Sequence, residues 1–200
     1  AILLGVLMVM ACAPSRYLLD VEMRYPSRSG VDLTGKNVTI AYGQEGMYPN
    51  DVFIKSMAES FAKNIKDKYH EAIGSVEVCR LDSAPEYANR DSMLNLLIST
   101  GADAVFLLDK VDFNNSSFSF ILKCYDGMNQ EDKVELFSGN SVADALNGDA
   151  DVMADGREAG KKLAAAFELQ WKQEQYSLYY YGSEEWYAAI EKAEAFDWKG

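Results

Sequence analysis

The chain has 200 residues, of which 48% are hydrophobic and 12% aromatic, and its formal net charge is −12. This size and apolar content suffice for one domain with its own core and a small appendage. The charge excludes nucleic acid as an expected partner, since phosphate binding needs a clustered excess of Lys and Arg. It also argues against adhesion of the protein surface to anionic lipid.

Residues 1–11 are uncharged and almost entirely aliphatic or Met. The run is shorter than the roughly 20 residues of a spanning helix, and it fits the apolar region of an export signal. The stretch Val9-Met10-Ala11-Cys12 resembles the bacterial lipobox, in which a small residue precedes a Cys that receives lipid. The resemblance implies a signal peptide at residues 1–11 and lipid on Cys12, which would anchor the protein stably. A buried strand or core helix is the alternative.

The residues after Cys12 bear on location. Ala13 follows the Cys, and not Asp, which by resemblance to enterobacterial sorting implies the outer membrane. No acidic cluster follows directly, which favours the periplasmic face over the cell surface. Residues 12–36 show no sustained period and contain Pro and Gly, so we expect a tether that begins to pack on the domain, with an edge strand at residues 17–21.

An α/β domain is expected at residues 37–175. In chain order we predict a strand at 38–42, a helix at 51–69, a strand at 76–81, a helical turn from 83, a helix at 91–100, strands at 104–108, 118–125 and 134–138, and a helix at 155–173. This order predicts an α/β (α+β) fold, a mixed β-sheet with helices packed on it, followed by a C-terminal helix.

The spacing of apolar residues supports these predictions. In the first helix an apolar residue recurs at every fourth position from Phe53 to Tyr69, while the other face is charged. Residues 104–108 are apolar without interruption, as in strands that are covered on both faces. Gly101 is expected to end the second helix with a positive φ.

The turn Thr100-Gly101-Ala102-Asp103-Ala104-Val105 leads into the central strand. Together with the lipobox and the hairpin, it resembles periplasmic α/β lipoproteins such as the N-terminal domain of TolB, the curli-secretion lipoprotein and the activators of penicillin-binding proteins. The chain is similar to a lipoprotein family of Bacteroides-type bacteria in which this domain precedes tetratricopeptide-like helices. The resemblance implies the fold, the envelope location and a tetratricopeptide-like start at residues 176–200; it carries over no catalytic residue.

Residues 147–158 have oxygen-bearing side chains at the spacing of an EF-hand loop. Val152 stands where that loop requires Gly, and Arg157 adds a positive charge. The alternative is that Asp155 caps a helix, with Glu158 completing a capping box. The weak calcium candidates are Asn147, Asp149, Asp151, Asp155 and Glu158.

Other candidate chemistry is sparse, so we expect no cofactor and no enzymatic activity. His70 is the single His, which argues against a zinc site, and nucleotide-binding and nucleophile motifs are missing from the sequence. Asp109 and Asp112 follow the apolar strand, where open α/β sheets keep their ligand crevices. Glycoside hydrolysis would need a pair of acids, which would come from Asp103, Asp109, Asp112 and Asp126.

The densest aromatic stretch lies near the C-terminus. Exposed rings there would stack on sugars or contact a partner, and buried rings would pack a helical hairpin, which is the expected arrangement. The possible ligand or partner surface comprises Tyr179, Tyr181 and Trp186, and the stretch also includes Tyr176, Tyr180 and Tyr187.

Cys79 and Cys124 both fall on predicted strands, in a compartment where disulfides persist. A bridge requires Cα atoms within about 7 Å, and the order of the strands is not given by the sequence. A disulfide and two buried thiols both remain open.

The sequence favours a lipid-anchored envelope protein that acts as a non-enzymatic protein-interaction or scaffold module, with the membrane and an envelope protein as partners. The alternative is a glycan-binding or glycan-processing lipoprotein.

Overall fold

The computed structural model describes residues 14–43, 49–82, 89–114, 117–129, 131–142, 148–180 and 182–195. These residues divide into two compact units. We call Pro26–Gln170 the α/β unit, and the described parts of Ala1–Tyr25 and Trp171–Gly200 the ribbon unit. Cys12 and the helical turn predicted from residue 83 lie outside the described residues.

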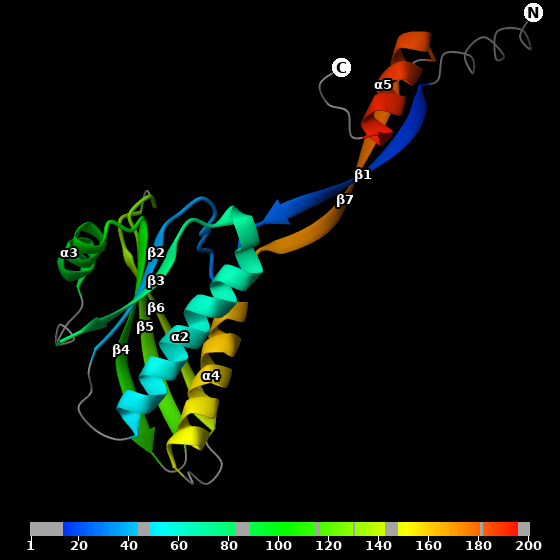
Figure 1. Ribbon diagram of the computed structural model, residues 1–200. Coiled ribbons are helices and arrows are strands. Elements are labelled where there is room, and N and C mark those ends of the chain that lie inside the picture. Colours follow the sequence, from blue (N-terminus) through cyan, green and yellow to red (C-terminus); the bar gives the residue numbers. More distant parts are fainter. Residues whose placement is uncertain are drawn as a thin grey trace, which may run out of the picture. The chain divides into compact units, whose positions relative to one another are not determined.

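A mixed β-sheet forms the centre of the α/β unit (Figure 1). Its described strands are β2 (Val38–Gly43), β3 (Val76–Leu81), β4 (Ala104–Asn114), β5 (Ser117–Asp126) and β6 (Val134–Val142). Their order is β3-β2-β4-β5-β6, with β2 parallel to both neighbours and the β4-β5-β6 part antiparallel. The predicted α/β (α+β) class is confirmed.

Helices cover both faces of this sheet. Their bounds are Asn50–Tyr69 for α2, Arg90–Thr100 for α3 and Asp149–Ala165 for α4, and a short 3-10 turn η1 spans His70–Ala72. The larger core lies between the sheet and the pair α2 and α4, and a smaller core lies under α3. Residues 104–108 are buried completely between the two cores, as their apolar run predicts.

The α2 helix follows the predicted spacing, since its every-fourth-residue stripe is buried from Phe53 to Tyr69. Gly156 and Gly160 of α4 face this helix at very short range. An added Cβ would lie 2.7 Å from the Phe53 carbonyl oxygen at Gly156, and 2.8 Å from the Phe61 amide nitrogen at Gly160. The two helices therefore touch backbone to backbone, which only glycine permits.

The predicted bounds of the third helix, 155–173, are wrong at both ends. The helix α4 begins at Asp149, directly after Gly148, whose φ of 127° lies outside the helical range. It ends at Ala165 because Phe167 turns into the core against the rings of Phe61 and Phe106. From residue 170 the chain is a strand, which the helical interpretation missed.

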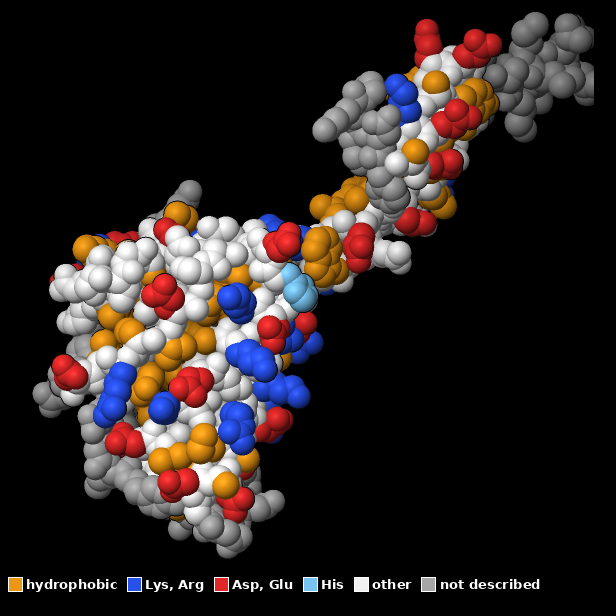
Figure 2. Space-filling view, viewed as in Figure 1, with side chains coloured by type: hydrophobic (Ala, Val, Ile, Leu, Met, Phe, Trp, Pro, Cys, Tyr) orange, Lys and Arg blue, Asp and Glu red, His pale blue; other side chains and the backbone are white. Residues whose placement is uncertain are grey.

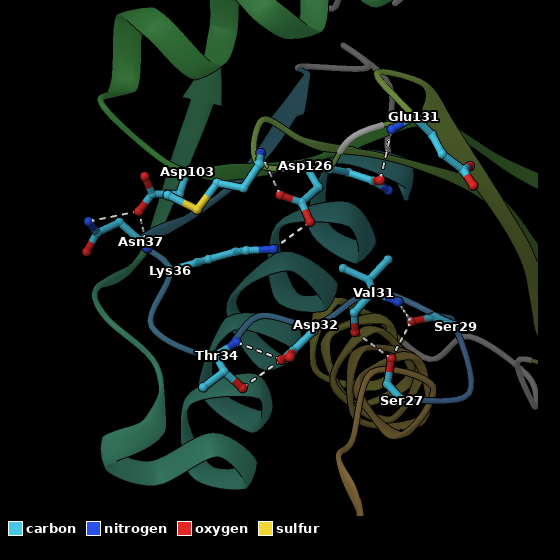
Figure 3. A network of polar contacts seen from close by, with 12 residues as sticks. Ser27, Ser29, Val31, Asp32, Thr34, Lys36, Asn37, Asp103, Asp126 and Glu131 are labelled. Atoms are coloured by element: carbon cyan, nitrogen blue, oxygen red, sulfur yellow. Dashed lines mark hydrogen bonds and ion pairs between the residues drawn. The ribbon is translucent and has the colours of Figure 1, made fainter. Parts of the chain in front are cut away.

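Residues 26–36, expected to belong to the tether, are packed on the α/β unit. Val31 and Leu33 are buried in the larger core. Figure 3 shows the polar contacts that fix this segment and the residue after it: Lys36 Nζ lies 2.5 Å from Asp126 Oδ2, and the Asn37 amide donates to Asp103 Oδ2 at 2.8 Å. This segment is therefore part of the folded unit.

The ribbon unit contains β1 (Ser15–Tyr25), β7 (Gln170–Tyr180) and α5 (Glu184–Glu194). Among its described residues, β1 and β7 form a two-stranded sheet. The strand β1 is longer than the expected edge strand at 17–21, and α5 is the predicted C-terminal helix. No helix in the described ranges is long and apolar enough to cross a bilayer.

Candidate functional site

A hollow of about 330 Å³ lies beside the carboxyl ends of β2 and β3. Among its lining residues only Asp149 was a predicted ligand, in the calcium loop. The strand-end rule nevertheless indicates this region, because parallel strands present their carboxyl ends at one edge of the sheet. The lining comprises Tyr42 from β2, Arg80 from β3, Asp149 and Met153 from α4, and Asp51, Val52, Lys55, Ser56 and Glu59 from α2.

Charges of both signs surround this hollow. Figure 2 shows this side of the α/β unit, where basic and acidic side chains alternate over α2 and α4. Lys55 Nζ lies 4.0 Å from Glu59 Oε1, one helical turn along α2. Burial raises the pKa of Tyr42; Arg80 opposes this, and the carboxylates of Glu59 and Asp51 add to it. The Tyr42 hydroxyl therefore stays protonated and can donate a hydrogen bond.

The expectation that Asp109 and Asp112 lie just past the end of the apolar strand is wrong. The strand β4 continues to Asn114, because residues 110–114 pair with β5 beyond a register shift between Leu108 and Lys110. Asp109 Oδ2 lies 2.7 Å from Lys123 Nζ, and both side chains are largely buried. Asp112 lies opposite Ser119, and both line a separate hollow of about 300 Å³.

The other two acids considered for hydrolysis have structural contacts. Asp103 accepts two hydrogen bonds from Asn37, from its backbone amide and its side chain. Asp126 forms an ion pair with Lys36. The carboxylates of Asp103 and Asp126, like that of Asp109, therefore connect segments of the α/β unit.

The EF-hand interpretation of residues 147–158 is wrong. Asn147 lies outside the described residues, and the other four oxygen donors belong to α4, which is helical from its first residue. An EF-hand ligand set needs a loop that turns its oxygens inward, and a helix directs them around its axis. Glu158 Oε1 instead lies 3.7 Å from Lys162 Nζ. The described residues contain no group of three or more His, Cys, Asp or Glu side chains suited to a metal.

The expected burial of the C-terminal aromatic residues in a helical hairpin is also wrong. Residues 176–180 belong to a strand, and Tyr181 lies outside the described residues. The rings are extensively exposed: 46% for Tyr176, 64% for Tyr179, 50% for Trp186 and 54% for Tyr187. The strand was not predicted because residues 172–175 are all polar, so an alternation of apolar and polar residues begins only at Tyr176.

The ribbon has one apolar face, since side chains alternate between the faces of a strand. Contacts across the strands define this face: Tyr25 Oη donates to Glu174 Oε1 at 2.8 Å, and Tyr176 Oη lies 2.9 Å from Met23 Sδ. The residues of the apolar face are Tyr17, Leu19, Val21, Met23, Tyr25, Tyr176, Leu178 and Tyr180.

The helix α5 lies at one end of the apolar face. Tyr17 Oη donates to Glu194 Oε1 at 3.0 Å, and the Tyr180 ring lies 5.8 Å from the ring of Tyr187. Further along the ribbon, Met23, Tyr176 and Leu178 remain exposed. We call these three residues the docking surface.

Cys79 and Cys124 are free thiols, so of the two alternatives, a disulfide or two unpaired thiols, the second holds. Cys79 is on β3 and Cys124 on β5, with β2 and β4 between them. Adjacent strands lie about 4.8 Å apart, so this separation exceeds the reach of a disulfide. The side chains also pack into different cores on opposite faces of the sheet.

No protein-family model matches the chain, and no curated protein matches it. Solved structures with some likeness include the PelC dodecamer from Paraburkholderia phytofirmans, at 11% identity and a TM-score of 0.45, covering 76% of this chain and 100% of that chain. The hypothetical protein CT253 from Chlamydia trachomatis matches at 11% identity and a TM-score of 0.28, over 66% of this chain and 98% of that one. At these scores the likeness carries no argument about function.

Proposed function

We propose that the chain is a lipid-anchored envelope protein that binds a protein partner through its ribbon unit, as a non-enzymatic interaction module. The exposed docking surface of Met23, Tyr176 and Leu178 is the observation that carries this proposal. A two-stranded ribbon is only marginally stable in water without a further surface to cover its apolar side. A partner that covers this face would bury apolar area and stabilise the ribbon.

The anchor follows from the lipobox-like sequence before Cys12. Cys12 precedes β1 by three residues, which is a reach of about 10 Å for an extended chain. Lipid on Cys12 would therefore hold the ribbon unit close to the membrane, at the periplasmic face of the outer membrane. Palmitate labelling and mass spectrometry of the native protein test this; we expect a lipid-modified Cys12, and loss of label in Cys12→Ser. An unmodified Cys12 with an intact leader would refute the anchor.

Photo-crosslinking tests the docking surface. A photoreactive residue at position 178 should crosslink to one envelope protein, identified by mass spectrometry. Adding Tyr176→Ser to this variant should reduce the yield of the crosslinked product several-fold. The control places the crosslinker at position 136, because Leu136 is 67% exposed and belongs to the α/β unit. Equal crosslinking from both positions, or none from 178, would contradict the proposal.

Glycan binding is the second candidate, because the exposed rings of Tyr179 and Trp186 offer stacking faces for sugars. A glycan array separates the candidates. Binding that is lost in Tyr179→Ala and Trp186→Ala, but retained in Leu178→Ser, would favour the glycan function. An array without hits would remove it.

A further inference from the structure

The hollow beside β2 and β3 belongs to the α/β unit and has no role in the proposed docking. The chain leaves β2 toward β3 on one side and later returns to β4 on the other, so the strand order reverses at β2. Open α/β sheets bind ligands beyond the carboxyl ends of their strands at such a reversal. Tyr42, at the end of β2, lines the hollow. The hollow thus lies at the carboxyl edge of the sheet, on the β3 side of the strand at which the order reverses.

The two walls of the hollow carry opposite charges. Arg80 comes from β3, the edge strand on one side of α2, and Asp149 comes from α4, which packs on the other side of α2. A helix with its side chains is about 10–12 Å across. Because both residues line the hollow, it reaches from one side of α2 to the other, across roughly the width of this helix.

Between the walls, the surface is mixed. Val52 and Met153 provide apolar contact, and the protonated Tyr42 hydroxyl can donate a hydrogen bond. Lys55 and Glu59 form an exposed ion pair at 4.0 Å, and Asp51 adds a further carboxylate on α2. This surface suits the backbone and side chain of a small, partly apolar molecule.

A ligand with a single charge would be attracted by one wall and repelled by the other. A ligand with opposite charges at its two ends matches both walls. An extended peptide spans about 3.3–3.6 Å per residue, so about three residues reach across α2. We propose that this hollow of about 330 Å³ binds a short zwitterionic peptide, with its carboxylate at Arg80 and its ammonium group at Asp149. The planar guanidinium is well suited to a carboxylate, which it binds through paired hydrogen bonds.

Calorimetric titration of the full 200-residue chain tests the proposal with three forms of one peptide. The probes are Ala-Leu-Ala, its N-acetylated form, which lacks the positive end, and its C-terminal amide, which lacks the negative end. We expect the unmodified peptide to bind about tenfold more tightly than either blocked form, corresponding to about 1.4 kcal/mol. Free alanine, which is too short to reach both walls, should bind at least as weakly as the blocked forms.

Two variants test which residue binds which end of the peptide. Arg80→Gln should weaken binding of the unmodified peptide about tenfold and leave the amide unchanged, because the amide has no carboxylate to lose. Asp149→Asn should weaken the unmodified peptide and leave the acetylated form unchanged. Lys66→Gln is the matched control, an exposed charge on α2 outside the hollow, and should change nothing. Urea midpoints equal to that of the parent confirm that the variants are folded.

Several results would overturn the proposal. Absence of heat at millimolar Ala-Leu-Ala would exclude the site. If both blocked forms bound as tightly as the unmodified peptide, recognition of its two charged ends would be excluded. An Arg80→Gln effect of the same size on the amide as on the unmodified peptide would show that Arg80 acts otherwise than on the carboxylate. These outcomes are independent of the anchor and of the docking surface, since no residue is shared.

Discussion

Asp132 joins three segments of the α/β unit at the level of single side chains. Its carboxylate accepts hydrogen bonds at 2.6 Å from Arg90 Nη2, at the start of α3, and at 2.6 Å from Tyr125 Oη on β5. The hydrogen bond from Arg90, followed by that from Tyr125, holds the pKa of Asp132 below its ordinary value. Its backbone has a positive φ of 46°, which Asp and Asn tolerate better than other non-glycine residues.

A lowered pKa in the folded state gives stability that is present above the unfolded pKa, about 3.9, and is lost as the pH falls through the folded pKa. We therefore expect Asp132→Asn to lower the urea midpoint at pH 6. The difference from the parent should shrink as the pH falls below about 4. Urea titrations between pH 6 and pH 2 measure it, and a difference that stays constant over this range would contradict the assignment.

The two cysteines lead to a prediction about thiol reactivity. Burial raises the pKa of Cys124 well above its usual range, and burial with a contribution from Glu77 raises that of Cys79. Because the thiolate is the reactive form, in a Cys12→Ser background we expect Cys79 to react slowly with a thiol reagent at pH 8 and Cys124 not to react. Both should react after unfolding. Mass spectrometry counts the adducts, and an intramolecular disulfide in the native protein would contradict the strand order.

At the scale of elements, the contact of α2 with α4 depends on glycine. Gly160→Ala would place a Cβ 2.8 Å from the Phe61 amide nitrogen, so the helices would have to move apart. Alanine favours an isolated helix by about 1 kcal/mol over glycine. We nevertheless expect a net loss of about 1–3 kcal/mol in the free energy of unfolding, because overpacking outweighs propensity.

Urea unfolding of Gly160→Ala measures this loss. Lys161→Ala is the control, because it is an exposed neighbour on the same helix and should change stability little. Unchanged or increased stability in Gly160→Ala would show that the helices have room to adjust.

At the scale of the whole molecule, the large buried side chains are concentrated in the α/β unit. We expect a chain limited to residues 26–170 to fold alone and to unfold cooperatively in urea, since both cores lie within it. Near-ultraviolet circular dichroism and a urea titration check this. A fragment without fixed aromatic signals would show that the ribbon unit is required for folding.

Much of the fold was accessible from the sequence because strong local patterns coincide with burial. The apolar repeat from Phe53 to Tyr69 and the continuous run at 104–108 each identify an element whose core contacts agree with its own periodicity. Gly101 ends its helix with a φ of 66°, as predicted. The candidate site was less accessible, since Arg80 carries no local signal and the spacing around Asp149 indicated a calcium loop.

The sequence by itself determined the class of the domain, the order of its main elements and a lipobox-like start, because these depend on local spacing and composition. Only the tertiary structure decided that residues 170–180 form a strand with β1, that the cysteines are apart, and that Asp109 pairs with Lys123. Strand order and register arise from contacts between distant segments, and one residue's shift in register exchanges the faces of a strand. The charged hollow exists for the same reason, since residues of four elements, β2, β3, α2 and α4, must come together to line it.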